Sequence, residues 1–334
     1  MAEPAVQPDA PQHAGADSDR PWEHPWAAWK SILKRVYTMD GYHNLSLMAA
    51  GVAFYAFLSF VPLLGAIVMT YGLVADPATV GQHMQAIFDL VPADAARLIS
   101  DQLIAVVTTA SEKAGLGLAI ALFLSIYGAM RASSAIIQAL NVIYEEEESR
   151  NIVKTTLLSA ALTLVTVLAA LVGLISAGIL GYLQAAVDIL GPAGVVAIKV
   201  TTWLVAGTIA SGAIGFVYRY GPDRATAKWR WLSVGSVAAT LLWLIATLGF
   251  GLYAANFANY NATYGALGAV VVLLMWLFLS SYAILIGAEI NAEAERQTAV
   301  DTTTGRPRPM GRRGATMADQ LPSKRQHKPR RDKY

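Results

Sequence analysis

The stretch Trp231–Ala288, WLSVGSVAATLLWLIATLGFGLYAANFANYNATYGALGAVVVLLMWLFLSSYAILIGA, contains no Asp, Glu, Lys, Arg or His. A bilayer core is about 30 Å thick and an α-helix rises about 1.5 Å per residue, so one span needs about 20 apolar residues. The 58 residues therefore hold two spans, predicted at about 231–253 and 265–288. The uncharged segment 254–264 between them is rich in Asn and Tyr, which is typical of a turn at a membrane interface.

Four further charge-poor segments precede this hairpin, and they predict spans at about 45–75, 115–131, 157–181 and 200–218. The whole chain of 334 residues is 55% hydrophobic and only 14% charged, which is too apolar for an ordinary soluble domain. The predicted fold class is therefore all-α, a polytopic membrane protein with six transmembrane helices in residues 26–295. Short amphipathic helices are expected on both sides of the membrane, including one that begins near Trp26.

The first span and the middle pair have features of their own. Pro62 lies near the middle of the first span, where proline removes a backbone donor and clashes with the preceding turn, so we expect a kinked or broken helix. Such a break either lines a binding site or is a structural kink, and both interpretations stay open. Small residues recur every fourth position at 173–181 and 207–215, which predicts that spans three and four pack as a pair.

The distribution of basic residues predicts the orientation of the chain. Six spans place both termini on one side, and 22 of the 25 Lys and Arg residues fall on that side. By the positive-inside rule both termini are cytoplasmic. Residues 1–25 are polar and rich in proline, and the tail 296–334 is strongly basic, so both are expected to be disordered, with the tail available to anionic lipid.

Several kinds of chemistry are disfavoured by the residues present. The chain has no cysteine, and its five histidines, at positions 13, 24, 43, 83 and 327, are widely separated. A metal-dependent nuclease needs clustered His and carboxylate ligands, and a nucleotide-driven transporter needs a phosphate-binding loop; neither pattern is visible. We therefore expect no enzyme activity, no cofactor or metal, and no nucleic-acid partner.

Five motifs resemble those of a known family. They are AGVAFYAFLSFVPLL at 50–64, NVIY at 141–144, YRYGPDR at 218–224, YNATYGALG at 260–268 and LIGAEINAE at 285–293. Across about residues 35–295 the chain resembles the YihY/BrkB family of bacterial inner-membrane proteins, whose members have carried the names virulence factor BrkB and ribonuclease BN. The resemblance implies six transmembrane helices and the bacterial inner membrane. It also implies transport, including of lipids, as an activity suspected for some members.

The leading functional hypothesis is a transporter or exporter component for a lipid or other amphiphile, because the interior is poor in charge and the first helix is expected to be broken. The alternative is a membrane scaffold that docks an extracytoplasmic partner protein at the connection 76–114 or at the turn 254–264. Residues predicted to line a pathway or gate are Tyr55, Ser59, Pro62, Arg131, Asn141, Arg219, Arg224, Asn259, Asn261, Tyr264, Glu289 and Asn291.

Glu289 carries the most specific of these predictions. It lies where the last span leaves the membrane, at a depth close to that of Arg131, Arg219 and Arg224. An ion pair between Glu289 and one of these arginines is expected, and it would either staple the ends of the helices or act as a gate. Asn259, Asn261 and Tyr264 form either a hydrogen-bonded outer gate or a plain turn.

Overall fold

A computed structural model describes residues 13–74, 114–186, 191–256 and 266–322, and its regular elements are helices. A short 3₁₀ helix, η1 (Pro21–Glu23), precedes α1 (Trp26–His43). The long helices are α2 (Leu45–Val74), α5 (Ala114–Ile143), α6 (Ile152–Ala186), α7 (Gly191–Tyr220), α8 (Trp229–Asn256) and α10 (Ala266–Arg296). A short α11 (Thr316–Asp319) follows them.

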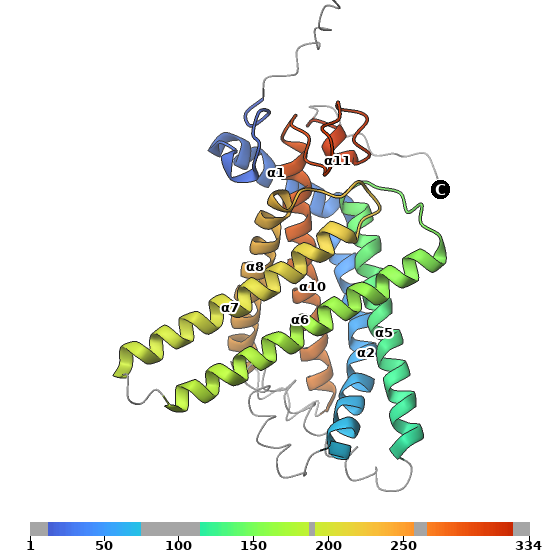
Figure 1. The fold of residues 1–334 in the computed structure, drawn as a ribbon, viewed down its shortest axis with the longest axis vertical. Coiled ribbons are helices and arrows are strands. Elements are labelled where there is room, and N and C mark those ends of the chain that lie inside the picture. The colour runs from blue at the N-terminus through green and yellow to red at the C-terminus, as the bar shows by residue number, and fades with distance from the viewer. Residues whose placement is uncertain (1–12, 75–113, 187–190, 257–265, 323–334) are drawn as a thin grey trace, which may run out of the picture.

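Each long helix packs against the next around the bundle. α10 lies between α8 and α2, α2 runs along α5, and α6 and α7 form a hairpin that joins α5 to α8 (Figure 1). In Figure 1 the α6–α7 hairpin crosses the other helices obliquely and extends to one side of the bundle. The predicted pairing of spans three and four is thus confirmed by the contact between α6 and α7.

Among the described residues, five helices are long and apolar enough to cross a membrane, within α5, α6, α7, α8 and α10. A sixth span results if α1 and Leu45–Phe60, which meet at a bend of 63°, are taken together. Asn44 lies at this bend in the left-handed conformation, with φ of 54°. An all-α polytopic membrane protein is therefore confirmed.

Two details of the predicted spans differ in the structure. α2 continues through Pro62 as one helix, so the helix is not broken there, and a bend of 63° lies at Asn44. The span predicted at 115–131 is part of a longer helix: α5 continues to Ile143, as the helical pattern of residues 132–144 in the sequence indicates, and its apolar face packs into the hydrophobic core of the bundle through Ile137, Leu140 and Ile143. Arg131 therefore lies within a span and not at its edge.

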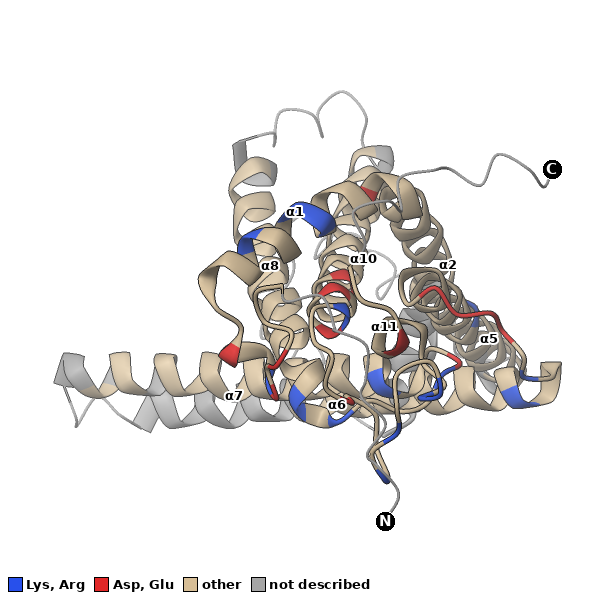
Figure 2. Ribbon diagram, turned by 90° about the horizontal axis from the view of Figure 1, so that it is seen from above, with Lys and Arg blue, Asp and Glu red and all other residues tan. Residues whose placement is uncertain are grey.

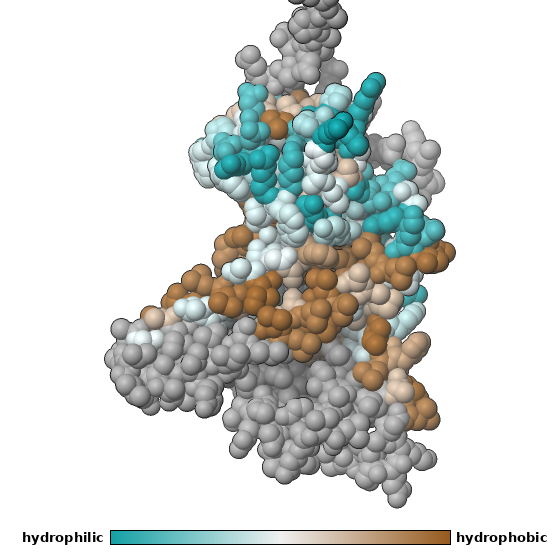
Figure 3. Space-filling model, in the orientation of Figure 1, coloured by the Kyte–Doolittle hydropathy of each residue, from teal (hydrophilic) through white to brown (hydrophobic). Residues whose placement is uncertain are grey.

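Both ends of the described chain lie at the same end of the bundle, which we call the terminal end (Figure 1). Hydrophilic side chains gather there, while hydrophobic side chains cover the described surface of the helices below (Figure 3). Seen from above, acidic and basic residues meet around the end of α10 (Figure 2). This polarity matches a bundle that stands in a membrane with its terminal end in water.

The predicted disorder of residues 1–25 and 296–334 is wrong for the parts that the structure describes. Residues 13–24 pack on the end of α10, where the hydroxyl of Thr298 donates to the carbonyls of Ala16 and Ser18. In the tail, Arg313 is buried and donates to the carbonyl oxygens of Ala299 and Ala318, both at 2.6 Å. These segments are polar, yet they are ordered because their backbone groups find partners on each other. Residues 1–12 and 323–334 lie outside the described part.

Candidate functional site: a lateral groove between α7 and α8

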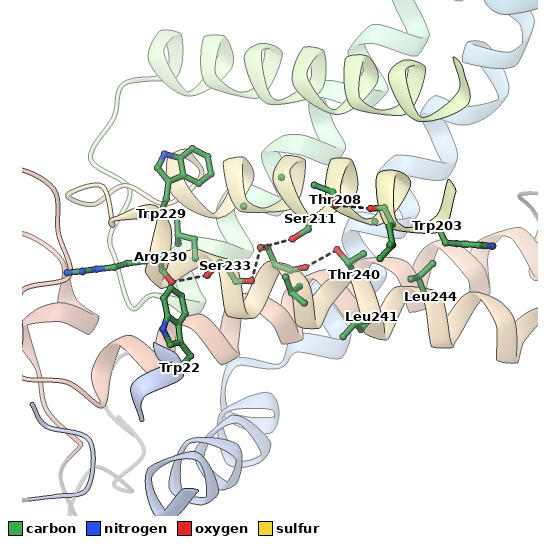
Figure 4. A pocket seen from close by; sticks show the side chains of 17 residues that line it. Trp22, Trp203, Thr208, Ser211, Trp229, Arg230, Ser233, Thr240, Leu241 and Leu244 are labelled. Atoms are coloured by element: carbon green, nitrogen blue, oxygen red, sulfur yellow. Dashed lines mark hydrogen bonds between the residues drawn. The ribbon is translucent and has the colours of Figure 1, made fainter. Parts of the chain in front are cut away.

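A groove of about 780 Å³ runs between α7 and α8 and opens to the side of the bundle. Its walls are mostly apolar or small side chains, and several of the large ones, including Trp203, Leu204 and Leu241, are exposed (Figure 4). The residues on α8 run from Trp229 to Leu244, a distance of about 22.5 Å at 1.5 Å per residue. That length exceeds one leaflet, which is roughly half of a hydrocarbon core about 30 Å thick.

The floor of the groove is made of small residues. A Cβ atom placed on Gly212 would meet no atom within 4 Å, and one on Gly207 would meet only Thr240, at 4.0 Å. Within the described side chains, the stripe Gly207, Ser211 and Gly215 therefore faces α8 and the groove. The corresponding side chains of α6, at 173–181, lie outside the described residues.

The hydroxyl groups in the groove are already satisfied within the protein. Ser211 and Ser236 share a hydrogen bond of 3.0 Å across the two helices, and Thr240 donates to the carbonyl of Ser236 at 2.9 Å (Figure 4). Serine and threonine hydroxyls that bond back to the preceding turn present little free polarity. The middle of the groove thus offers an apolar surface, suited to a hydrocarbon chain.

Aromatic and basic side chains surround the groove where it lies closest to the terminal end of the bundle. Trp22 from η1, Trp229 and Arg230 frame it, and the guanidinium of Arg219 lies 5.1 Å from the ring centroid of Trp229. The Nε atoms of Arg219 and Arg230 are buried and have no hydrogen-bond partner in the described part of the chain. Tryptophan and arginine at the mouth of an apolar groove suit the polar head of an amphiphile.

A second, smaller pocket of about 390 Å³ lies between α2 and α5, and it collects several predicted residues. Tyr55, Pro62 and Arg131 line it, and Ser59 lies beside it in the contact of α2 with Gly128. The hydroxyl of Ser59 donates to the carbonyl of Ala56 at 2.7 Å. The structure therefore brings together four of the predicted pathway residues, on a face of the bundle different from that of the groove.

The predicted residues near the end of α10 lie instead in a buried ionic cluster. Glu289 does not pair with Arg131, Arg219 or Arg224; the Nδ1 atom of His43 lies 3.0 Å from its carboxylate. Arg224 pairs with Glu295, at 2.6 Å. The expected ion pair with an arginine is therefore wrong: the bend at Asn44 brings the end of α1 against α10, so the partner of Glu289 is a histidine that the sequence did not indicate.

Four more residues belong to this ionic cluster. Arg296 binds Glu145 at 2.6 Å and Glu293 at 3.1 Å, and Arg35 of α1 also pairs with Glu293. Glu289, Glu293, Glu295 and Arg296 are each at most 2% exposed. The end of α10 therefore holds together α1 and the segments that follow α5 and α7.

The side chains of Asn141 and Asn291 form hydrogen bonds with backbone groups at the terminal end of the bundle. The side chain of Asn291 accepts from the amide of Gly235 at 2.7 Å and donates to the carbonyl of Leu232 at 3.0 Å. Asn141 accepts from the amide of Asp223 at 2.8 Å and donates to Glu148 at 2.8 Å. Hydrogen bonds from Arg150 lower the pKa of Glu148 below its ordinary value. These asparagines fix helices and loops to each other.

Some predicted features cannot be placed, and the groove itself was missed. Asn259, Asn261 and Tyr264, and most of the connection 76–114, lie outside the described residues. The sequence signal for the groove was present in the small residues of α7 and in Ser233, Ser236 and Thr240 of α8. Among the described residues, no group of three or more His, Asp or Glu is placed to hold a metal ion.

Comparison with known proteins gives one family. A family model for virulence factor BrkB matches residues 40–311. The ribonuclease-like protein YfkH of Bacillus subtilis is 30% identical over 270 residues, which cover 78% of this chain and 94% of that protein. A UPF0761 membrane protein of Photobacterium profundum is 28% identical over 284 residues, covering 84% of this chain and 85% of the relative.

A longer relative matches over part of its length. A UPF0761 membrane protein of Rhodospirillum centenum is 30% identical over 268 residues, covering 75% of this chain and 54% of that protein. No solved structure matches the chain.

Proposed function

This chain belongs to the virulence factor BrkB family of membrane proteins, and from that premise we propose that it is a transporter or exporter component for a lipid or other amphiphile. The observation that carries the proposal is the lateral groove between α7 and α8. A groove with apolar walls, open to the side of a membrane bundle, admits an acyl chain directly from the bilayer.

The polar end of the groove provides the selectivity. Lipid tails are as apolar as the groove, so hydrophobicity alone does not draw a chain out of the bilayer. The cation of Arg230, together with Trp22 and Trp229, offers charge and aromatic surface to a headgroup. An anionic or zwitterionic amphiphile therefore suits this groove better than a neutral hydrocarbon does.

The proposed location is the bacterial inner membrane, with both termini cytoplasmic. It rests on the positive-inside rule and is supported by the polar side chains that cover the terminal end (Figure 3). Contact of the tail with anionic lipid is part of the same proposal, supported by the exposed positions of Arg306, Arg308 and Arg312. The groove then runs from the cytoplasmic headgroup region into the membrane.

No specific observation favours either of the other two roles, the membrane scaffold or the ribonuclease. The segments assigned to partner docking, 76–114 and 254–264, lie mostly outside the described residues, so the scaffold stays a prediction. The ribonuclease-like name belongs to the Bacillus protein, and we infer no enzyme activity for this chain.

The proposal is tested by filling the groove without disturbing the helices. Gly212→Leu places a side chain in the groove where a Cβ meets no atom within 4 Å, and Gly249→Leu on α8, which also meets none and does not line the groove, is the matched control. Movement of a fluorescent phospholipid between leaflets is measured in proteoliposomes at equal protein content. We expect wild type and Gly249→Leu to move lipid faster than empty liposomes, and Gly212→Leu to lose that excess.

Two results would contradict the proposal. One is a wild-type rate equal to that of empty liposomes. The other is a Gly212→Leu rate equal to wild type, which would show that lipid does not pass through this groove.

A further inference from the structure

Arg131 stands out because its charge lies inside a span. The span within α5 runs from Ala119 to Ile143, which places Arg131 twelve residues from either end, or about 18 Å along the helix. A charged side chain at such a position is costly and in most membrane proteins has a functional role. Arg131 is nevertheless exposed on the side of the bundle, so its charge is not used to hold the helices together.

The guanidinium of Arg131 keeps most of its hydrogen-bonding capacity. Its Nε atom donates to the hydroxyl of Tyr127 at 3.1 Å, and the group lies 5.3 Å from the centroid of the same ring. No carboxylate in the described part of the chain pairs with it, in contrast to Arg35, Arg224 and Arg296. The two terminal nitrogens therefore remain as a fixed fork of donors, the geometry that binds phosphate oxygens in pairs.

The surroundings of Arg131 are apolar and held in place. The pocket of about 390 Å³ has Leu58 and Pro62 of α2 on one wall and Leu124 of α5 on the other. At its base α2 and α5 are in close contact, since a Cβ on Gly128 would come within 2.7 Å of that of Ser59. A ligand here meets one cation, the side chains of Tyr55 and Tyr127, and otherwise hydrocarbon.

We propose that this pocket binds the phosphate of a membrane phospholipid, with Arg131 as the ligand of the phosphate oxygens and Tyr127 as the residue that orients the guanidinium. The apolar walls and the position within a span favour a phosphate that belongs to a lipid over free phosphate. The site lies on α2 and α5, apart from the groove on α7 and α8, so it does not depend on the proposed transport. Filling the groove with Gly212→Leu leaves this site intact.

The test counts phospholipid bound to the detergent-purified protein by native mass spectrometry during titration with phosphatidylglycerol. We expect Arg131→Gln to weaken one binding event about tenfold, the effect of losing one charge-assisted hydrogen bond. Lys154→Gln, which removes an exposed cation near the start of α6, away from the pocket and from the tail, is the matched control and keeps wild-type binding. Leu124→Trp fills the pocket while leaving the arginine in place, and it is expected to weaken the same event.

Two further ligands, diacylglycerol and inorganic phosphate, test which chemical group the pocket recognises. Diacylglycerol with the same chains lacks the phosphate and is expected to bind wild type and Arg131→Gln equally weakly. Inorganic phosphate at millimolar concentration is expected to leave the bound lipid in place. Equal binding of phosphatidylglycerol by wild type and Arg131→Gln would overturn the proposal, and so would diacylglycerol binding as tight as that of the phospholipid, or complete displacement of the lipid by free phosphate.

Discussion

Arg224, on the segment after α7, donates two hydrogen bonds to the carboxylate of Glu295 near the end of α10, at 2.8 and 2.6 Å. Both side chains are 2% exposed, and the guanidinium also lies 4.8 Å from the ring centroid of Tyr144, which follows α5. Burial raises the pKa of the Tyr144 hydroxyl above its ordinary value, so the ring stays neutral beside the pair. One arginine therefore connects three segments of the terminal end.

Removing one partner of this pair leaves a buried charge. We expect Arg224→Met to lower the free energy of unfolding by about 3–5 kcal/mol, the usual loss when one partner of a buried ion pair is removed. Thermal unfolding of the protein in detergent measures the change.

The double variant Arg224→Met, Glu295→Met is expected to recover part of that loss, because it leaves no unpaired charge. Arg312→Met is the control for an exposed arginine and should leave the unfolding temperature nearly unchanged. If Arg224→Met unfolds at the wild-type temperature, the pair does not stabilise the bundle.

The spans were predictable because hydropathy and length act locally. A run such as Trp231–Ala288 has no alternative to the membrane, and the structure confirms α8 and α10 there. The continuation of α5 past Arg131 follows from the apolar pattern that includes Leu140 and Ile143, but the core that this face joins is known only from the packing. Order in the tail also depends on distant partners, such as the Arg313 contacts with Ala299 and Ala318.

The candidate site was harder to predict from the sequence than the spans were, because it depends on tertiary contacts. The stripe Gly207, Ser211 and Gly215 is visible in the sequence, but the helix that it faces is not, and the structure places α8 there. The partner of Glu289 is likewise 246 residues away, and the bend at Asn44 is needed to bring His43 to it. Sequence patterns indicate which residues are unusual, while the folded chain decides which of them meet.

A close approach of α8 to α10 at Gly235 gives a second prediction. A Cβ on Gly235 would lie 2.1 Å from the carbonyl oxygen of Gly287 and 2.4 Å from Cγ of Asn291. Gly235→Ala therefore forces the helices apart, and we expect a loss of about 1–3 kcal/mol in the free energy of unfolding, as for other overpacked positions.

Gly249→Ala in the same helix is the matched control, since a Cβ there meets no atom within 4 Å. It should leave stability equal or raise it by up to about 1 kcal/mol through helix propensity. Thermal unfolding distinguishes the two variants, and equal temperatures for both would contradict the close crossing.

The contact between Glu289 and His43 gives a third prediction. Both side chains are nearly fully buried, at 0% and 3% exposed, so removing the carboxylate leaves the imidazole without this partner. We expect Glu289→Ala to lose about 1–3 kcal/mol of stability, the cost of an unsatisfied buried group.

Glu289→Gln retains an oxygen that accepts from His43, and its loss should be smaller than that of Glu289→Ala. Unfolding temperature and membrane abundance measured together check this order. The assignment of Glu289 as a staple fails if Glu289→Ala matches wild type in both.

The docking of residues 13–24 is expected to depend on pH through His24. Its Nε2 lies 3.1 Å from the carbonyl oxygen of Ala294, and its Nδ1 is buried without a partner, so the neutral ring with the proton on Nε2 fits. Burial lowers the pKa of His24 below 6.5; nearby Arg35 and His13 lower it further, whereas the Ala294 hydrogen bond and Glu23 raise it. A proton on Nδ1 would be a buried donor with no acceptor.

Because the pKa of His24 is lower in the docked state than in the released state, docking has its full stability above pH 6.5 and loses it as pH falls from 6.5 towards the lowered pKa. The chain contains no cysteine, so Asp17→Cys carries a single spin label on the docked segment. In the chain that keeps His24, we expect the label to be immobilised at pH 8 and to become mobile on acidification below pH 6.5. In His24→Gln the label is expected to remain immobilised at both pH values, because the glutamine amide still donates to Ala294 but does not titrate. A transition of the same size in His24→Gln would assign the pH dependence to another group.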